Sequence, residues 1–229
     1  MFGSDIIGLT RLKLDDSVPD SAGNYLWSAL ELLFALQAAL DELTTSGLLI
    51  KDRSTASICS ISIVRGTAEY NLSPRIIMIN DPIVLTTLAR PIYPVTESHL
   101  YDFYGDSWAT QTGNPTHYVA DLERRKIRFF PIPIANDTVT MDVYRTSVVR
   151  FTEANITTVT PEVAEEWHYG LISGMLSNAY DKNDVETREM PGFQIASTKW
   201  ANTIEQAKRL VIKNRYREQR SSIPRGLIC

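Results

Sequence analysis

The chain has 229 residues, 44% of them hydrophobic and 22% charged, with a formal net charge of −4. That length suffices for one large or two small domains with a hydrophobic core, and the composition is ordinary for a soluble globular protein. The longest apolar-rich stretch, residues 26–40, is too short and too polar to span a bilayer, and no signal peptide is visible. Two cysteines, Cys59 and Cys229, fit neither a disulfide framework nor a zinc site, which favours a reducing cytoplasm.

Residues 1–49 are predicted to contain a long helix. Ser28 and Glu31 fit a capping box, in which each side chain binds a free backbone N–H of the first turn, so the helix should begin after Ser28. Trp27 before the cap suits a hydrophobic staple, and Gly47 ends the helix. Apolar residues cover almost its whole circumference, including Leu33, Phe34, Leu36, Leu40 and Leu43. Such a helix is buried on several sides, by its own chain or by a neighbouring subunit.

Residues 50–155 are predicted to form a β domain. Short alternating or β-branched runs are separated by Gly, Pro, Asn and Asp; they are Ser57–Val64, Glu69–Leu72, Arg75–Ile79, Ile83–Leu88, His117–Ala120, Lys126–Phe130 and Thr138–Tyr144. Several short strands at close spacing indicate a small antiparallel sandwich or barrel. One segment differs, because Leu100, Phe103 and Tyr104 stand at helical spacing and predict a short helix against the sheet.

Residues 156–217 are predicted to form two further helices. In the first, Thr160 is expected to be the N-cap and Pro161 the first helical residue, with Glu162 favourable toward the helix dipole. Apolar residues then recur at helical spacing, and the polar run 181–184 ends this helix.

The last helix is expected from about Gly192 to about Arg215, and residues 218–229 form an irregular tail. One face of this helix is apolar and carries Phe193, Ala196, Trp200, Ile204, Ala207 and Val211. The predicted fold is therefore α+β, a bundle of the N-terminal helix and two C-terminal helices with an inserted antiparallel β-sandwich or barrel domain.

The charge is unevenly distributed along the chain. Residues 205–229 hold seven basic and two acidic residues, a balance of +5, which leaves −9 for the other residues of a chain with a total of −4. An acidic body with a basic end suggests that the end contacts something acidic, although a solvated helix would show the same charges.

Signals for catalysis, cofactors or metals are weak. His99, His117 and His168 lack metal-binding spacing, and the sequence has no nucleophile-elbow, phosphate-loop or dinucleotide-binding motif. Aromatic and large apolar residues are better read as core or as anchors of subunit contacts, where Trp and Tyr are enriched. The candidates for such core or contact roles are Trp27, Leu33, Phe34, Trp167 and Trp200.

A more specific signal lies between Trp108 and Pro133. In this stretch a Trp is followed by Gly-x-Pro-x-x-Tyr and then by an apolar strand closed by Pro-x-Pro; the residues are Trp108, Gly113, Pro115, Tyr118, Pro131 and Pro133. This order resembles the head-to-tail adaptor, or connector, proteins of tailed bacteriophages, most of all those of short-tailed phages. Weaker likenesses extend it over residues 26–200. One of these likenesses is to a Tyr-x-Leu-Pro motif of the family at residues 70–74, where Ser73 is an extra residue. Residues 1–20 and 218–229 match nothing in the family.

The resemblance implies a structural virion protein, assembled from the host cytoplasm into the neck between head and tail. Adaptor subunits form a twelve-fold ring that docks beneath the portal ring after DNA packaging, holds the tail tube or nozzle, and lets DNA pass through its lumen. It implies no enzymatic activity, cofactor or membrane partner. We hypothesise that the C-terminal end contacts the portal, through Arg209, Lys213, Arg215, Arg217, Arg220, Leu227 and Ile228.

Two alternatives stay open at this point. The basic C-terminal helix could bind nucleic acid through phosphate contacts, which would show as strong salt dependence. An enzyme built on the β domain would need a pair of carboxylates in a cleft, and the sequence offers no clear pair.

Overall fold

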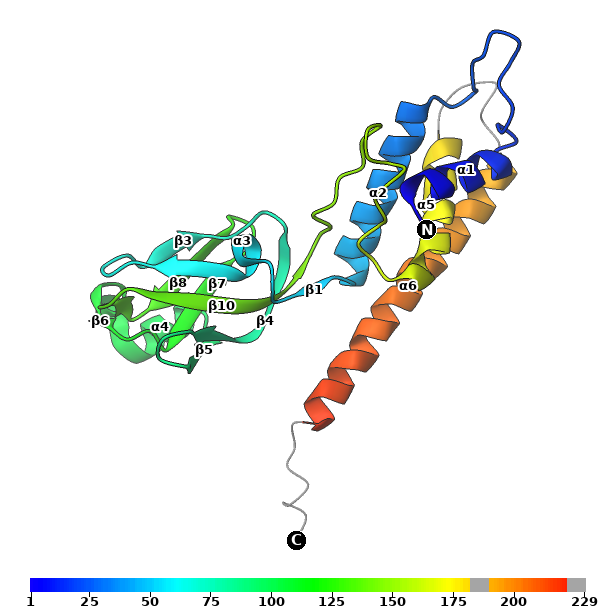
Figure 1. The fold of residues 1–229 in the computed structure, drawn as a ribbon. Coiled ribbons are helices and arrows are strands. Elements are labelled where there is room, and N and C mark those ends of the chain that lie inside the picture. Colours follow the sequence, from blue (N-terminus) through cyan, green and yellow to red (C-terminus); the bar gives the residue numbers. More distant parts are fainter. Residues whose placement is uncertain (182–189, 222–229) are drawn as a thin grey trace. The chain divides into compact units, whose positions relative to one another are not determined.

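The computed structural model describes residues 1–181 and 190–221, with side chains described up to residue 214. The chain divides into two compact units, one formed by Met1–Ile50 with Ser147–Cys229 and the other by Lys51–Thr146. Figure 1 shows the first unit as a group of helices and the second as a curled sheet with short helices. The α+β fold with a β domain inserted between bundle helices is thus confirmed. Residues 147–155, which we had grouped with the β region, belong to the helical unit.

The helical unit consists of α1 (Gly3–Lys13), α2 (Ala29–Gly47), the short 3-10 helix η2 (Glu165–Trp167), α5 (His168–Tyr180) and α6 (Met190–Ser221). α2 begins at the predicted capping box, where Glu31 N donates to Ser28 Oγ at 3.2 Å and Ser28 N donates to Glu31 Oε2 at 2.8 Å. Its residues Leu36, Leu40 and Leu43 are fully buried in the core of this unit.

α5 packs closely against both α2 and α6. A Cβ atom placed on Gly174 of α5 would lie 2.9 Å from the Cβ of Ala39 and 3.0 Å from the ring of Trp200. Only a residue without a side chain allows the three helices to approach this closely, which explains the glycine in an otherwise apolar helix.

α1 was not predicted from the sequence. It is held by Ile6 and Thr10, which are fully buried, and Thr10 Oγ1 donates to the carbonyl of Ile6 at 2.8 Å. The following loop is fixed by the buried Asp16, whose carboxylate accepts Arg11 Nη1 at 2.5 Å and the backbone N–H of Leu26 at 2.7 Å.

The predicted helix start at Thr160 is wrong. η2 begins at Glu165 and α5 at His168, and the residues between Thr160 and Ala164 are not helical. The reason lies in Glu162, whose carboxylate accepts the backbone N–H of Val148 at 2.7 Å and the hydroxyl of Ser147 at 3.1 Å. The acidic side chain therefore fixes a loop instead of facing a helix dipole.

The β unit is one curled, mostly antiparallel sheet with the strand order β1-β10-β4-β5-β7-β8-β3, and β2 also pairs with β10. The bounds are β1 Lys51–Asp52, β2 Ser60–Ile63, β3 Glu69–Asn71, β4 Ile76–Leu85, β5 Arg90–Pro94, β7 His117–Asp121, β8 Lys126–Phe130 and β10 Asp137–Arg145. The small pair β6 (Thr112–Gly113) and β9 (Ile132–Pro133) lies outside this sheet. Helices α3 (Ala56–Cys59), α4 (Glu97–Tyr104) and η1 (Gly105–Thr110) complete the unit.

Three details differ from the sequence-based expectation. The predicted strands Arg75–Ile79 and Ile83–Leu88 form a single strand, β4. The first half of the predicted strand Ser57–Val64 is the helical turn α3. Strand β5, Arg90–Pro94, was missed because two prolines interrupt its pattern, and it pairs with β4 on one side and with β7 in parallel on the other.

Candidate functional site

The segment that carried the resemblance folds into one corner of the β unit. Trp108, in η1, is buried against Leu100 of α4 and Phe130 of β8. Gly113 pairs with Pro133 in the parallel β6–β9 contact, and a Cβ on Gly113 would touch Pro131 at 3.4 Å. Pro115 is buried as well. These residues are closely packed and determine the shape of this corner. A recognisable sequence pattern is therefore expected at these positions.

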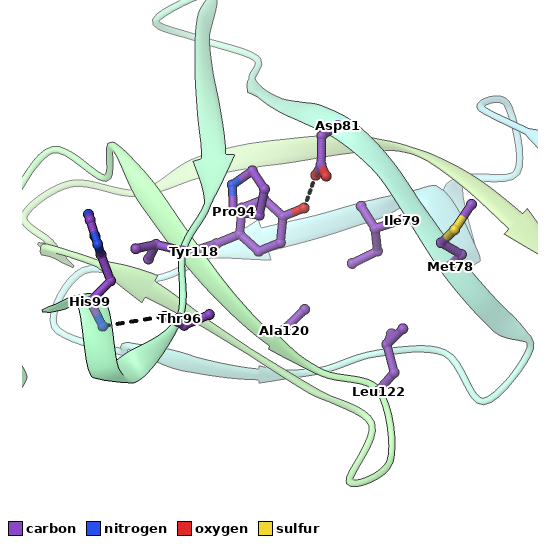
Figure 2. A pocket seen from close by; sticks show the side chains of 10 residues that line it. Met78, Ile79, Asp81, Pro94, Thr96, His99, Tyr118, Ala120 and Leu122 are labelled. Carbon is purple, nitrogen blue, oxygen red and sulfur yellow. Dashed lines mark hydrogen bonds between the residues drawn. The ribbon is translucent and has the colours of Figure 1, made fainter. Parts of the chain in front are cut away.

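Tyr118 connects this corner to an open groove between β4, β5, β7 and the start of α4 (Figure 2). The groove has a volume of about 530 Å³ and is lined by Met78, Ile79, Asp81, Pro94, Val95, Thr96, His99, Tyr118, Ala120 and Leu122. The buried Tyr118 hydroxyl donates a hydrogen bond to the exposed carboxylate of Asp81. Burial, and then this hydrogen bond, raise the pKa of Tyr118 far above its usual value, so the hydroxyl stays protonated and remains a donor.

α4 presents aromatic side chains beside this groove. Phe103 is 70% exposed, and Tyr101 and Tyr104 are about half exposed. The sequence placed Phe103 and Tyr104 against the sheet, but Leu100 is the residue of the three that is buried. Tyr104 nevertheless rests on Phe130, with ring centroids 4.9 Å apart.

A second apolar surface lies on α2. Phe34 is 63% exposed, and Leu30, one helical turn before it, has about half of its surface exposed. Leu26, which precedes the helix, is exposed to a similar extent. Beside Phe34 is a smaller hollow of about 360 Å³, lined by Trp27, Glu31, Leu32, Phe34, Ala35, Ala38, Asn178 and Ala179.

The residues predicted as core or subunit contacts differ in how deeply they are buried. Trp27, Leu33 and Trp200 are buried in the helical core, and Trp200 Nε1 donates to Glu42 Oε2 at 2.8 Å. Trp167 is partly buried against that core. Phe34 alone of the five is largely exposed, so it is the one available for a contact with another molecule.

The predicted basic contact residues lie on α6 or beyond the described chain. Arg209 is exposed and pairs with Glu205 at 3.1 Å, one helical turn away, and Lys213 is exposed. Arg215, Arg217 and Arg220 lie on the helix, where side chains are not described, and Leu227 and Ile228 lie outside the described residues. The helix α6 ends at Ser221 in the described chain, later than the sequence predicted.

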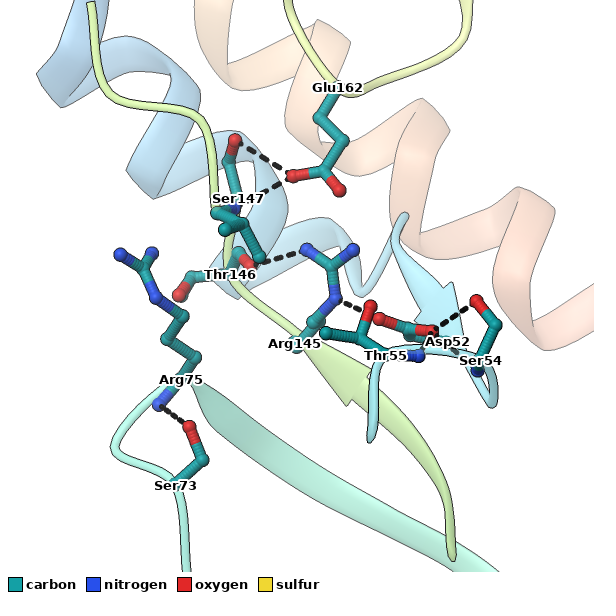
Figure 3. A network of polar contacts seen from close by, with 10 residues as sticks. Asp52, Ser54, Thr55, Ser73, Arg75, Arg145, Thr146, Ser147 and Glu162 are labelled. Carbon is teal, nitrogen blue, oxygen red and sulfur yellow. Dashed lines mark hydrogen bonds and ion pairs between the residues drawn. The ribbon is translucent and has the colours of Figure 1, made fainter. Parts of the chain in front are cut away.

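The polar contacts drawn in Figure 3 fix the ends of the β unit and, separately, a loop of the helical unit. Arg145 Nε donates to Asp52 Oδ2 at 2.5 Å, and both side chains are almost fully buried. Burial acts to raise the pKa of Asp52, but hydrogen bonds from Thr55, Arg145 and Ser54 outweigh it and hold that pKa well below its usual range. Cys59 lies in the same region, and burial and the nearby Asp52 raise the pKa of its thiol to about 11. This arrangement serves stability and leaves the thiol unreactive at neutral pH.

Among the described residues, no group of three or more His, Cys, Asp or Glu side chains is placed to hold a metal ion. Within the same part of the chain, no helix has both the length and the apolar character needed to cross a bilayer. His168 is buried and contacts the carbonyl of Val163 through Nε2 at 3.1 Å, as expected for a structural histidine.

Residues 1–225 fit the model of the family described as SU10 adaptor protein. The match includes residues 1–20, for which the sequence alone had given no likeness. No curated protein matches the chain.

Proposed function

The chain belongs to the SU10 adaptor protein family, which makes it a structural protein of the phage virion, and we propose that it is the head-to-tail adaptor subunit of its phage. In this proposal the subunits form a ring, dodecameric as the resemblance implies, that docks beneath the portal after DNA packaging. The ring offers the attachment platform for the tail tube or nozzle, and DNA passes through its lumen. The observation that carries the proposal is the family match over residues 1–225.

The apolar surface on α2 supports the formation of a ring. Leu30 and Phe34, one helical turn apart on α2, form an exposed row next to a hollow lined mainly by apolar side chains. Exposed apolar rows of this kind mark interaction sites in soluble proteins. Closed rings use contacts between two different surfaces of the same subunit. We assign the α2 row to one side of that contact, with a second copy of the chain as the partner.

The C-terminal part of α6 supports portal docking. Arg209 and Lys213 are exposed on it, and three further arginines, Arg215, Arg217 and Arg220, follow on the same helix. With the apolar Leu227 and Ile228 behind them, these residues suit a partner surface that is acidic and has an apolar groove. The same basic helix is the feature that would favour nucleic-acid binding, the alternative function.

Removal of residues 222–229 and, separately, charge reversal of Arg209 and Lys213 distinguish the two functions. Portal docking predicts that either change abolishes cosedimentation with the portal ring while the thermal unfolding of the protein is unchanged. Nucleic-acid binding predicts instead that wild-type protein binds duplex DNA with a steep salt dependence and that portal association is unaffected by these changes. Lys199→Glu, on the same helix but outside the proposed contact, is the matched control.

A further inference from the structure

The groove beside α4 has the features of a binding site for a positively charged side chain. Its volume of about 530 Å³ lies in the range of small-ligand pockets, and most of its walls are apolar. Asp81 is its charged group, and no lysine or arginine is among its lining residues in the described chain.

Asp81 is held in a fixed orientation. One of its oxygens accepts the hydrogen bond from Tyr118, whose side chain is buried on β7. Its other oxygen accepts no hydrogen bond from the described residues, and the Asp81 side chain is exposed. A carboxylate that is fixed by a buried donor loses little conformational freedom when it binds a ligand, so more of the interaction is realised as affinity.

The exposed aromatic residues of α4 continue from this groove. His99 belongs to both, because it lines the groove and its ring lies 4.5 Å from that of Phe103. Tyr101 packs on the buried Trp108, with ring centroids 5.6 Å apart. Tyr101 thus rests on a buried ring while part of its own ring stays exposed, and exposed aromatic residues are enriched among those that anchor protein contacts.

We propose that this groove binds an arginine or lysine side chain of another virion protein, and that apolar residues flanking it in that protein pack on the aromatic side chains of α4. The cationic head would reach the second oxygen of Asp81, since charge-assisted hydrogen bonds to carboxylates are the strong ones. The aliphatic stem would lie along Ile79 and Leu122, and the rings of α4 attract cations through their π faces.

Charge complementarity favours a separate protein over a second copy of this chain. Residues 1–204 carry a net −9, which follows from the chain total of −4 and the +5 of residues 205–229. The body of a second copy would therefore bring like charge to an acidic groove. The groove proposal rests on the role of the family in the virion but not on portal docking. Cation binding in the groove and docking to the portal can therefore fail independently.

The test is an NMR titration of the ¹⁵N-labelled full chain with three capped tripeptides, Leu-Arg-Leu, Leu-citrulline-Leu and Leu-Glu-Leu. Citrulline keeps the shape of arginine without its charge. We expect the arginine peptide to shift the amide signals of residues that line the groove and to bind at least ten-fold more tightly than the citrulline peptide. The glutamate peptide should cause no shifts there.

Three variants localise the binding. Asp81→Asn keeps an acceptor for Tyr118 but removes the charge, and should weaken arginine-peptide binding about ten-fold or more. Ala120→Phe fills the groove from an exposed position and should abolish binding with Asp81 intact. Asp106→Asn, on η1, makes the same charge change outside the groove and should bind as the wild type does.

Equal affinity for the arginine and citrulline peptides, or unchanged binding by Asp81→Asn, would overturn the proposal. Groove signals that move with protein concentration in the absence of peptide would identify a second copy of this chain as the occupant, and would overturn the assignment to a separate protein.

Discussion

The ion pair between Asp52 and Arg145 joins β1 to β10 at the place where the chain enters and leaves the β unit. Both side chains are buried, so neither charge can be solvated if the other is removed. Asp52→Asn is predicted to lower the free energy of unfolding of the β unit by roughly 3–5 kcal/mol, the usual cost of leaving a buried charge unpaired. Urea unfolding followed by circular dichroism measures the loss, and a loss below about 1 kcal/mol would contradict the assigned role.

The same carboxylate predicts a dependence of stability on pH. The pKa of Asp52 is lowered in the folded protein, whereas an unfolded Asp titrates near about 3.9. Its contribution is therefore complete above pH of about 4 and is lost as the pH falls from there through the lower, folded pKa. The difference in unfolding free energy between wild type and Asp52→Asn should be smaller at pH 3 than at pH 7. If this difference in unfolding free energy were the same at pH 3 and pH 7, the ionised Asp52 carboxylate would not be the source of the stability.

At the scale of elements, the contact of α5 with α2 and α6 depends on Gly174. Gly174→Ala is predicted to destabilise the helical unit by about 1–3 kcal/mol, because the new methyl group overpacks the space beside Ala39 and Trp200. Gly8→Ala, in α1, is the control: a Cβ at that position meets nothing within 4 Å, and the higher helix propensity of alanine should stabilise by about 0.5–1 kcal/mol. Thermal unfolding of both variants should show shifts of opposite sign.

The two faces of α2 predict opposite effects for neighbouring residues. Leu33→Ala should cost about 2–5 kcal/mol of stability because Leu33 is buried in the core. Phe34→Ala, at an exposed position, should change stability by less than about 0.5 kcal/mol but should prevent ring formation on the portal. Sedimentation of the portal complex measures the second effect, and a complete ring with Phe34→Ala would remove the α2 row from the subunit contact.

Elements with strong local signals could be predicted from the sequence, and elements that depend on distant partners could not. α2 was located by its capping box and α4 by its apolar spacing. The helix start at Thr160 was misplaced because Glu162 binds Ser147 and Val148, which no local pattern shows. The groove at Asp81 was missed for the same reason, because β4 and β7 come close together only in the folded sheet, on either side of β5.

For the whole molecule, the central claim is that this chain is the subunit of a ring that assembles on the portal. Two observations support it: the family match over residues 1–225, and the exposed row of Leu30 and Phe34 on α2. The most direct test is the native mass of the purified protein, measured alone and after mixing with the portal ring of its phage. We expect one discrete complex whose added mass equals about twelve copies of the 25.8 kDa chain. A portal ring whose mass does not change at saturating protein would contradict it.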